Sequence, residues 1–453
     1  MFASLSGVFS VMAFFAAADS SWWTTVGIGT AVNGLCLVYT LRAGGFEWQS
    51  GPLAYLFVLW LFHFPLTLFV CLQVNLDSSI PSYILSWVHN SSWYHAAAYA
   101  NACAAGFALG CLFARQRWAT PCEVPLRPNA ALYYTGLTTA ILAASGLGVI
   151  FMRGGGSQVF SMSYGSMYKS GTLFGSNFTL ACLLVAVGVT MAIPNATAGK
   201  RWPLVALQSG VTAVVLLTGA RSYALMGALV LVVIAAKARV RIKPIYLLWG
   251  FLLALLIISA VGVARSRGVV NSQLGSSSIG PTAALAEMGG SLKTVTLAID
   301  WIEAGDQLQW GGGYWLPIER ALGLIVPGLR KDLSTDPRAM SEVMLSRVSG
   351  LGGSAVAEAF YNFGLAGIGV FVLLGCLLGY LHLNARSPAA IAFESVVLYA
   401  LILEVRNWFI SVPAMIAVGA VPIVIGLCLR GKEIPRTTSD AFTRRGISFY
   451  ERG

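Results

Sequence analysis

Apolar residues occur along this chain in runs that are long enough to cross a lipid bilayer, and short polar or charged stretches separate them. Spanning the hydrocarbon layer takes about 20 mostly apolar residues per helix. Runs of roughly this length, bounded by charges or by Pro and Gly, indicate membrane spans. The pattern predicts about twelve membrane-spanning helices, with approximate limits 3–18, 23–41, 52–73, 93–113, 131–152, 172–193, 202–220, 222–236, 244–264, 354–383, 389–405 and 408–428.

The composition supports this fold class. Of the 453 residues, 57% are hydrophobic and 10% are charged, whereas a soluble domain carries about 25% charged residues. We therefore expect an all-α polytopic integral membrane protein, in contact with membrane lipids. A soluble enzyme, a nucleic-acid binder and a disulfide scaffold are excluded. The eight cysteines and four histidines show no metal-ligand spacing, and no nucleotide-binding fingerprint is present, so neither a metal nor a cofactor is expected.

The excess of 29 Lys and Arg over 18 Asp and Glu is a topology signal, because the basic residues stand in short loops. By the positive-inside rule, the even-numbered connections, both termini and the basic tail 429–453 are predicted to be cytoplasmic. The first segment ends in three alanines, as a cleaved signal peptide would, but its lack of preceding cations argues against cleavage. The even-numbered connections carry Arg42, Arg115, Arg117, Arg127, Lys200, Arg201, Lys237, Arg239, Arg241, Lys243 and Arg386.

A long connection at 265–353 divides the chain into spans 1–264, this loop, spans 354–428 and the tail 429–453. Loops of that length are usually functional or disordered. A helical stripe of apolar residues, with Lys293 and Asp300 on the other side, favours a helix that lies on the membrane or covers a cavity. The topology places the loop outside the cytoplasm. The stripe is formed by Leu292, Val295, Ile299 and Ile302, and the aromatic side chains of the loop are Trp301, Trp310, Tyr314 and Trp315.

Several arginines stand at the predicted outer ends of spans, where a charge is costly and is a functional hypothesis by default. The alternative for each is that its guanidinium reaches the lipid headgroups; we favour this for Arg406 and the functional interpretation for Arg221. A guanidinium binds phosphate oxygens bidentately, so such a group would suit a lipid-linked pyrophosphate. The set comprises Arg153, Arg221, Arg265, Arg267 and Arg406.

The tenth predicted span carries an acidic residue inside its apolar run. Ser354 is placed to cap the helix, which puts Glu358 about one turn inside and Asn362 on the same face. Glu358 is therefore a candidate general base, and the alternative is that it only complements the helix N-terminus. Glu394 and Glu404 are instead expected to be packing partners of arginines.

Small residues and one histidine also carry structural predictions. Gly106-x-x-x-Gly110 and Gly375-x-x-x-Gly379 are typical of closely packed membrane helices. His63 lies inside a predicted span, where a hydrogen-bonded core position is expected.

With these features, the chain resembles the Wzy family of O-antigen polysaccharide polymerases. The resemblance covers the number of spans, the large late outer loop and Gly219-Ala220-Arg221-Ser222. Its most specific stretches run from Trp310 to Pro327 and from Ala357 to Gly367, the latter similar to a family block E-x-x-x-N-x-G-x-x-G.

The resemblance implies a membrane glycosyltransferase of GT-C-like architecture in the bacterial inner membrane. It would be an inverting, metal-independent enzyme that moves a growing glycan from undecaprenyl pyrophosphate to the non-reducing end of a new lipid-linked repeat unit at the periplasmic face. Glu358 and Arg221 would be catalytic, and a polysaccharide chain-length regulator is a partner the resemblance allows. The substrate-binding residues would be Arg153, Arg265, Arg267, Arg406, Asn362, Tyr314 and Trp315.

Three alternatives remain open. An O-antigen ligase shares the donor and topology, but it would be expected to carry a functional histidine in the outer loop, and 265–353 contains none. A transporter or flippase for lipid-linked sugars usually shows internal repeats, and we find no clear one. A scaffold subunit of an envelope assembly is the third alternative.

Overall fold

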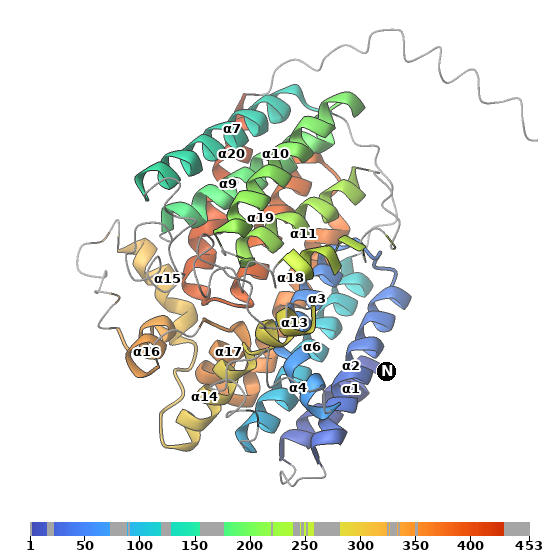
Figure 1. Cartoon of the computed structure of the whole chain (residues 1–453), viewed down its shortest axis with the longest axis vertical. Helices are drawn as coiled ribbons and strands as arrows, with labels where there is room; N and C mark the ends of the chain where they lie inside the picture. The colour runs from blue at the N-terminus through green and yellow to red at the C-terminus, as the bar shows by residue number, and fades with distance from the viewer. Residues whose placement is uncertain are drawn as a thin grey trace, which may run out of the picture.

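The regular elements of the described chain are all helices (Figure 1). The computed structural model describes residues 2–15, 22–72, 88, 91–118, 128–154, 176–218, 221–238, 245, 249–250, 252–257, 281–323, 326, 333, 336–348 and 352–429. Helices lie at all the predicted apolar segments; of 244–264, residues 245, 249–250 and 252–257 are described, and they are helical. The described part of the chain is thus all-helical, as expected for a polytopic membrane protein.

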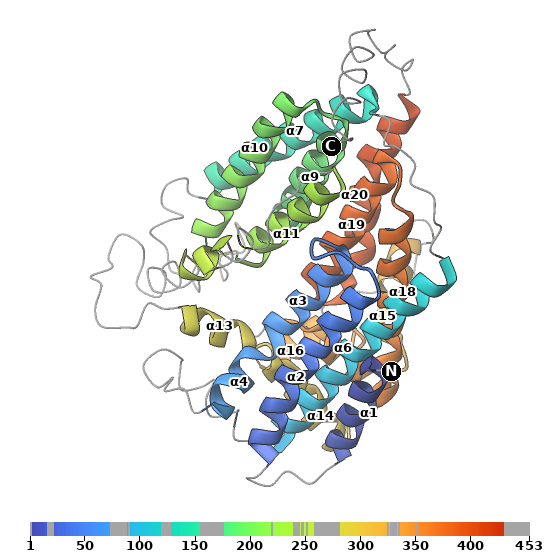
Figure 2. The same cartoon turned by 90° about the vertical axis from the view of Figure 1, so that its right-hand side faces the viewer.

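The helices form two bundles that meet at α3, α11, α18 and α19 (Figures 1 and 2). The first bundle contains α1 (Phe2–Phe15), α2 (Trp22–Ala43), α3 (Gly51–His63), α4 (Pro65–Cys71), α6 (Ser91–Trp118) and α18 (Ile368–Asn384). The second contains α7 (Ala130–Arg153), α9 (Ser176–Ala192), α10 (Ala198–Leu217), α11 (Arg221–Lys237), α19 (Pro388–Glu404) and α20 (Val412–Cys428). Helix pairs α6 and α18, and α7 and α9, make the most extensive contacts.

Six described helical segments are long and apolar enough to cross a membrane. They are Val26–Ala43, Ser91–Trp118, Ala130–Arg153, Asn177–Asn195, Ala355–Asn384 and Phe409–Cys428. The pair α3 and α4 adds a seventh if it counts as one span, although it bends by 51°. The bend has a simple cause, because Pro65 lacks the N–H that would continue α3.

The tenth predicted span is interrupted, which the sequence pattern did not indicate. It consists of α17 (Ala355–Phe363), the short 3₁₀ segment η4 (Gly364–Gly367) and then α18. Gly364 has a φ of +58°, which a residue with a Cβ adopts only with strain. The carbonyl of Gly364 also accepts a hydrogen bond from the Tyr99 hydroxyl at 3.2 Å.

Close packing of α6 against α18 confirms the prediction made for the two small-residue motifs. A Cβ on Gly110 would stand 2.1 Å from the carbonyl oxygen of Val372, and a Cβ on Gly375 would stand 2.1 Å from that of Phe107. Only glycine allows the backbones to approach this closely.

The described part of the long loop contributes four helices: α13 (Pro281–Gly289), α14 (Leu292–Glu303), α15 (Gly312–Leu322) and α16 (Met340–Arg347). The predicted stripe lies on α14, and three of its four residues are fully buried, Ile302 being half-buried. However, α14 does not lie on the surface, because it packs between α6 and α17. Lys293, expected on an exposed side, is therefore 7% exposed, and burial lowers its pKa.

A buried ion cluster ties the two bundles together. The carboxylate of Glu394 on α19 lies 2.5 Å from Lys237 Nζ on α11 and 2.7 Å from His382 Nδ1 on α18. The Lys237 ammonium also donates to the carbonyl of His382 at 2.8 Å. Glu394 thus has a basic partner as expected, but the partners are a lysine and a histidine and not an arginine.

Candidate functional site

Helix α17 and its N-cap carry the polar residues that the sequence singled out. Ser354 caps the helix, since its hydroxyl accepts a hydrogen bond from the Ala357 N–H at 3.3 Å. Glu358 is 2% exposed and Asn362 is fully buried. The Asn362 side chain donates to the carbonyl of Glu358 at 2.9 Å, which confirms that the two residues lie on one face. The predicted cap of Ser354 and the predicted common face of Glu358 and Asn362 are therefore confirmed.

Glu358 is held by a second helix. Its Oε2 accepts a hydrogen bond from the Phe409 N–H at 2.7 Å, where the 3₁₀ segment η5 (Phe409–Ser411) leads into α20. A carboxylate satisfies an unpaired N–H at a helix start and is stabilised there by the helix dipole. Among the described residues, Oε1 has no hydrogen-bond partner. Oε2 thus fixes the carboxylate at the start of α20.

His63 supports this helix start from α3. Its Nδ1 lies 2.9 Å from the carbonyl oxygen of Leu59, and its Nε2 lies 2.9 Å from the Ser354 hydroxyl. Because a carbonyl only accepts, Nδ1 carries the proton, and the neutral ring accepts from Ser354 through Nε2. The prediction of a hydrogen-bonded core histidine is confirmed, and its partner is the cap of α17.

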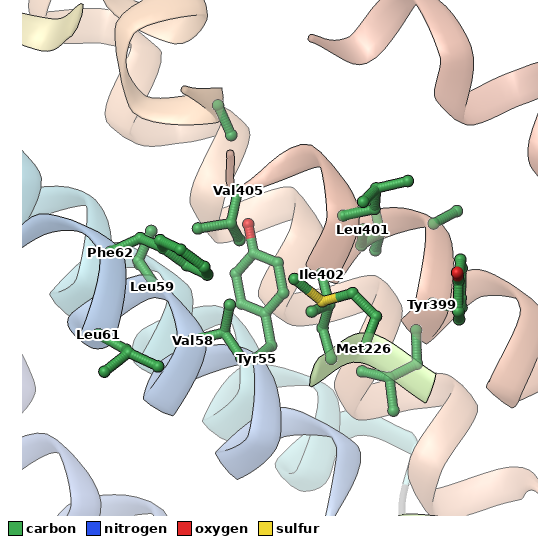
Figure 3. Packing of buried hydrophobic residues seen from close by; sticks show 14 of the residues in the cluster. Tyr55, Val58, Leu59, Leu61, Phe62, Met226, Tyr399, Leu401, Ile402 and Val405 are labelled. Atoms are coloured by element: carbon green, nitrogen blue, oxygen red, sulfur yellow. The ribbon is translucent and has the colours of Figure 1, made fainter. Parts of the chain in front are cut away.

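A second buried carboxyl stands next to Glu358, and the sequence analysis missed its importance. Glu404 is 1% exposed, and within the described ranges neither of its oxygens has a hydrogen-bond partner. No described arginine pairs with it, so the expectation of an arginine partner stays a prediction for the arginines outside the described ranges. The hydroxyls of Tyr55 and Tyr314 are also buried without a described partner. Figure 3 shows the Tyr55 ring between α3 and α19, with its hydroxyl on the side of Val405.

These polar groups interact electrostatically. Burial raises the pKa of Tyr314 well above its ordinary value, and the charges of Glu358, Glu404 and then Tyr55 raise it further. A buried polar group without a partner is costly, so a cluster of them is unusual unless a polar ligand or water binds there. No period or spacing reveals this cluster, because its members come from α3, α15, α17 and α19.

Asn362 also fixes the loop to α17. Its Oδ1 accepts from the Gly313 N–H at 3.0 Å, and its carbonyl accepts from the Trp310 N–H at 2.8 Å. Tyr314 is thereby packed against Phe363 and Phe409, with ring centroids 5.8 and 4.8 Å away. Tyr314 therefore joins the site from the first turn of α15.

The predicted arginines lie at different positions relative to the site. The Arg406 guanidinium is half-buried and lies 5.4 Å from the Phe62 ring centroid, close to Gly352 at the entry of α17. Arg406 is thus beside the site, which does not support the headgroup position we favoured for it. Arg153 is exposed at the end of α7. Arg221 begins α11, but its side chain and the whole of Arg265 and Arg267 lie outside the described part of the chain.

Of the nine predicted site residues, the structure brings together Glu358, Asn362, Tyr314 and Arg406. Trp315 follows Tyr314 on α15, but it is 55% exposed and therefore outside the buried cluster. The missed members are Glu404, Tyr55 and His63. A signal for Glu404 was present in the sequence, namely a carboxyl inside an apolar run.

The two helical bundles and this buried site define a polytopic membrane protein with a carboxylate-lined polar centre at the helix junction. The profile of the O-antigen polysaccharide polymerase family Wzy matches residues 8–434. The chain belongs to this family. It is also similar to Protein CapE of Staphylococcus aureus, with 22% identity over 307 residues. That match covers 65% of this chain and 65% of the relative's own length. No solved structure matches the chain.

Proposed function

We propose that this protein polymerises lipid-linked oligosaccharide repeat units. It would transfer the growing glycan from undecaprenyl pyrophosphate to the non-reducing end of a new lipid-linked unit, as an inverting glycosyltransferase. Membership of the Wzy family supports the reaction class. The observation that carries the proposal in this chain is the Glu358 carboxylate, buried and fixed through Oε2 while Oε1 has no described partner.

The chemistry needs one base and a stabilised leaving group. The acceptor hydroxyl attacks the anomeric carbon of the donor glycan, and its proton passes to Glu358. The bond from the anomeric carbon to the phosphate oxygen breaks, and its electron pair leaves with undecaprenyl pyrophosphate. Arginines stabilise the negative charge that develops there, an effect worth about 2.7–4 kcal/mol per donor in comparable oxyanion sites. We assign this role to Arg221, Arg265, Arg267 and Arg406, with Arg153 at the margin.

The topology that goes with this function has twelve spans in a GT-C-like arrangement, in the bacterial inner membrane. Both termini would be cytoplasmic, and the site and the loop 265–353 would face the periplasm. The distribution of basic residues supports this orientation. Tyr314, Trp315 and Asn362 would contact the glycan, and a chain-length regulator would be a partner in the membrane.

The test is incubation of the purified full chain with a lipid-pyrophosphate oligosaccharide, without nucleotide or metal, followed by gel analysis. Wild-type protein should produce a ladder. Glu358→Gln should lose the ladder while it still binds the donor, and Arg221→Ala should lose long products at unchanged protein abundance. Glu303→Gln, at an exposed position on α14, is the matched control. A full ladder from Glu358→Gln would reduce Glu358 to a helix cap.

A further inference from the structure

The segment 309–312 forms a tight turn with an unusual residue in it. The Gly312 N–H donates to the carbonyl of Gln309 at 2.9 Å, and the two central residues, Trp310 and Gly311, have φ values of +49° and +85°. Two positive φ values define a type I′ turn, in which Asn, Asp and Gly are strongly preferred. Trp310 is the one non-glycine residue with positive φ in the part of the chain described. A bulky side chain at this position costs conformational energy.

The turn is firmly attached to α17. The Trp310 N–H donates to the carbonyl of Asn362 at 2.8 Å, and the Gln309 N–H donates to that of Tyr361 at 3.2 Å. On its other side, the Gln309 side chain donates to the carbonyl of Pro337 at 2.7 Å. The strained conformation is therefore fixed by hydrogen bonds. Strain that is held in this way points to function, since a glycine would form the same turn without it.

The Trp310 side chain gains nothing for the core, because it is 76% exposed. Ion pairs lie near the turn, since Gly312 is next to Arg338, and Gln309 is bonded to Tyr361, the partner of Asp306. The Arg347 guanidinium lies 2.6 Å from the Asp306 carboxylate. Arg338 lies 2.6 Å from Glu319 and 2.8 Å from the buried Asp336. The partly exposed Arg347, Asp306 and Arg338 are typical of a surface in water, which argues against an indole buried in lipid.

We propose that Trp310 is a stacking platform for a sugar ring of the glycan, an inference that rests on the proposed polymerase function. A pyranose ring has an apolar C–H face and polar hydroxyls at its edge. An exposed indole on a fixed turn offers a flat apolar surface for the face, and the partly exposed Asp306 and Arg338 near the turn offer hydrogen-bond partners for the hydroxyls.

The attachment of the turn to α17 determines which sugar Trp310 contacts. Glu358 and Asn362 are one helical turn apart, and the turn is bound to the backbone at Asn362. The indole is outside the buried centre, so the sugar on it is one that neighbours the reacting sugar and not the reacting sugar itself. The platform would therefore hold the glycan chain in register while Glu358 acts on its end.

Binding of an oligosaccharide that has no lipid tests this role directly. The probe is the repeat-unit oligosaccharide released by mild acid from the lipid-linked units of the producing cells, and its Kd for the full chain is measured calorimetrically. Trp310→Ala and Trp310→Gly should each weaken binding about ten-fold. Trp310→Gly should not lower the Tm, because glycine relieves the strained φ. Trp202→Ala removes an equally exposed indole, 75% accessible, from α10 and should bind like wild-type protein.

The outcomes separate this proposal from the proposed function. Wild-type protein that ladders and binds the probe, with both Trp310 variants binding equally well, would refute the platform alone. Wild-type protein that neither ladders nor binds would refute both. Glu358→Gln should bind the probe with unchanged Kd although it forms no ladder. The protein is also placed in phosphatidylethanolamine and phosphatidylglycerol vesicles whose acyl chains are brominated. If the lipid bromine quenches tryptophan fluorescence and Trp310→Phe abolishes that quenching, the indole lies in lipid, and the platform is refuted.

Discussion

Replacing Gly375 by alanine tests how closely α6 and α18 are packed. The added methyl would stand 2.1 Å from the Phe107 carbonyl oxygen, and nothing soft lies between them, since the nearest other atoms, the Phe107 carbonyl carbon and the Cys111 amide nitrogen, also belong to the backbone of α6. Ordinary contacts between heavy atoms are about 3.5–4.0 Å. The two helices would therefore have to separate by roughly 1 Å or more along this contact.

The expected cost follows from the packing that the separation removes. A gap of 0.5–1 Å forfeits about a quarter to a half of each dispersion contact, and overpacked cores lose about 1–3 kcal/mol. Phe107 and Leu378 are fully buried beside this contact, so the loss extends beyond the glycine itself. We therefore expect Gly375→Ala to lower the free energy of unfolding by an amount in that range, once the stabilising effect of the higher helix propensity of alanine is subtracted.

Gly369→Ala provides that correction because it makes the same chemical change on the same helix. A Cβ at Gly369 would meet nothing within 4 Å, so this variant reports only the propensity gain of up to about 1 kcal/mol. Equilibrium unfolding in mixed detergent and SDS micelles, followed by circular dichroism, gives both free energies. Gly375→Ala should be less stable than Gly369→Ala by about 1–3 kcal/mol. Equal free energies of unfolding for the two variants would refute the close contact.

Two further predictions concern ion pairs. Lys237→Met leaves the buried Glu394 with His382 alone, and it should lower the free energy of unfolding by about 3–5 kcal/mol in the same assay. The double variant Lys237→Met/Glu394→Gln should recover much of this loss. A single variant as stable as wild-type protein would contradict the cluster. The hydrogen bond from Arg347, opposed by burial and aided by Tyr361, lowers the pKa of Asp306. A lowered folded-state pKa stabilises the protein at neutral pH, and this contribution is lost as the pH falls through that pKa. Arg347→Met should therefore have a lower Tm than wild-type protein at pH 7, and the difference should shrink below about pH 4; a difference independent of pH would exclude the pair as its cause.

The sequence determined the features that depend on local chemistry and periodicity. The apolar runs predicted where helices lie, since each span must satisfy its own backbone hydrogen bonds in lipid. Ser354 predicted the start of α17, and the spacing of Glu358 and Asn362 predicted their common face. The glycine motifs predicted a close helix contact, which the structure shows between α6 and α18.

Only the tertiary structure decided what these elements meet. It places α14 between α6 and α17, so Lys293 is buried, and it gives Glu358 the N–H of Phe409 as its partner. It also brings Glu404, Tyr55 and Tyr314 into one buried cluster and holds Trp310 in a strained turn. The physical reason is that these contacts join residues far apart in the chain. Periodicity fixes which face of a helix is apolar, but the partner of that face depends on how all the helices pack together.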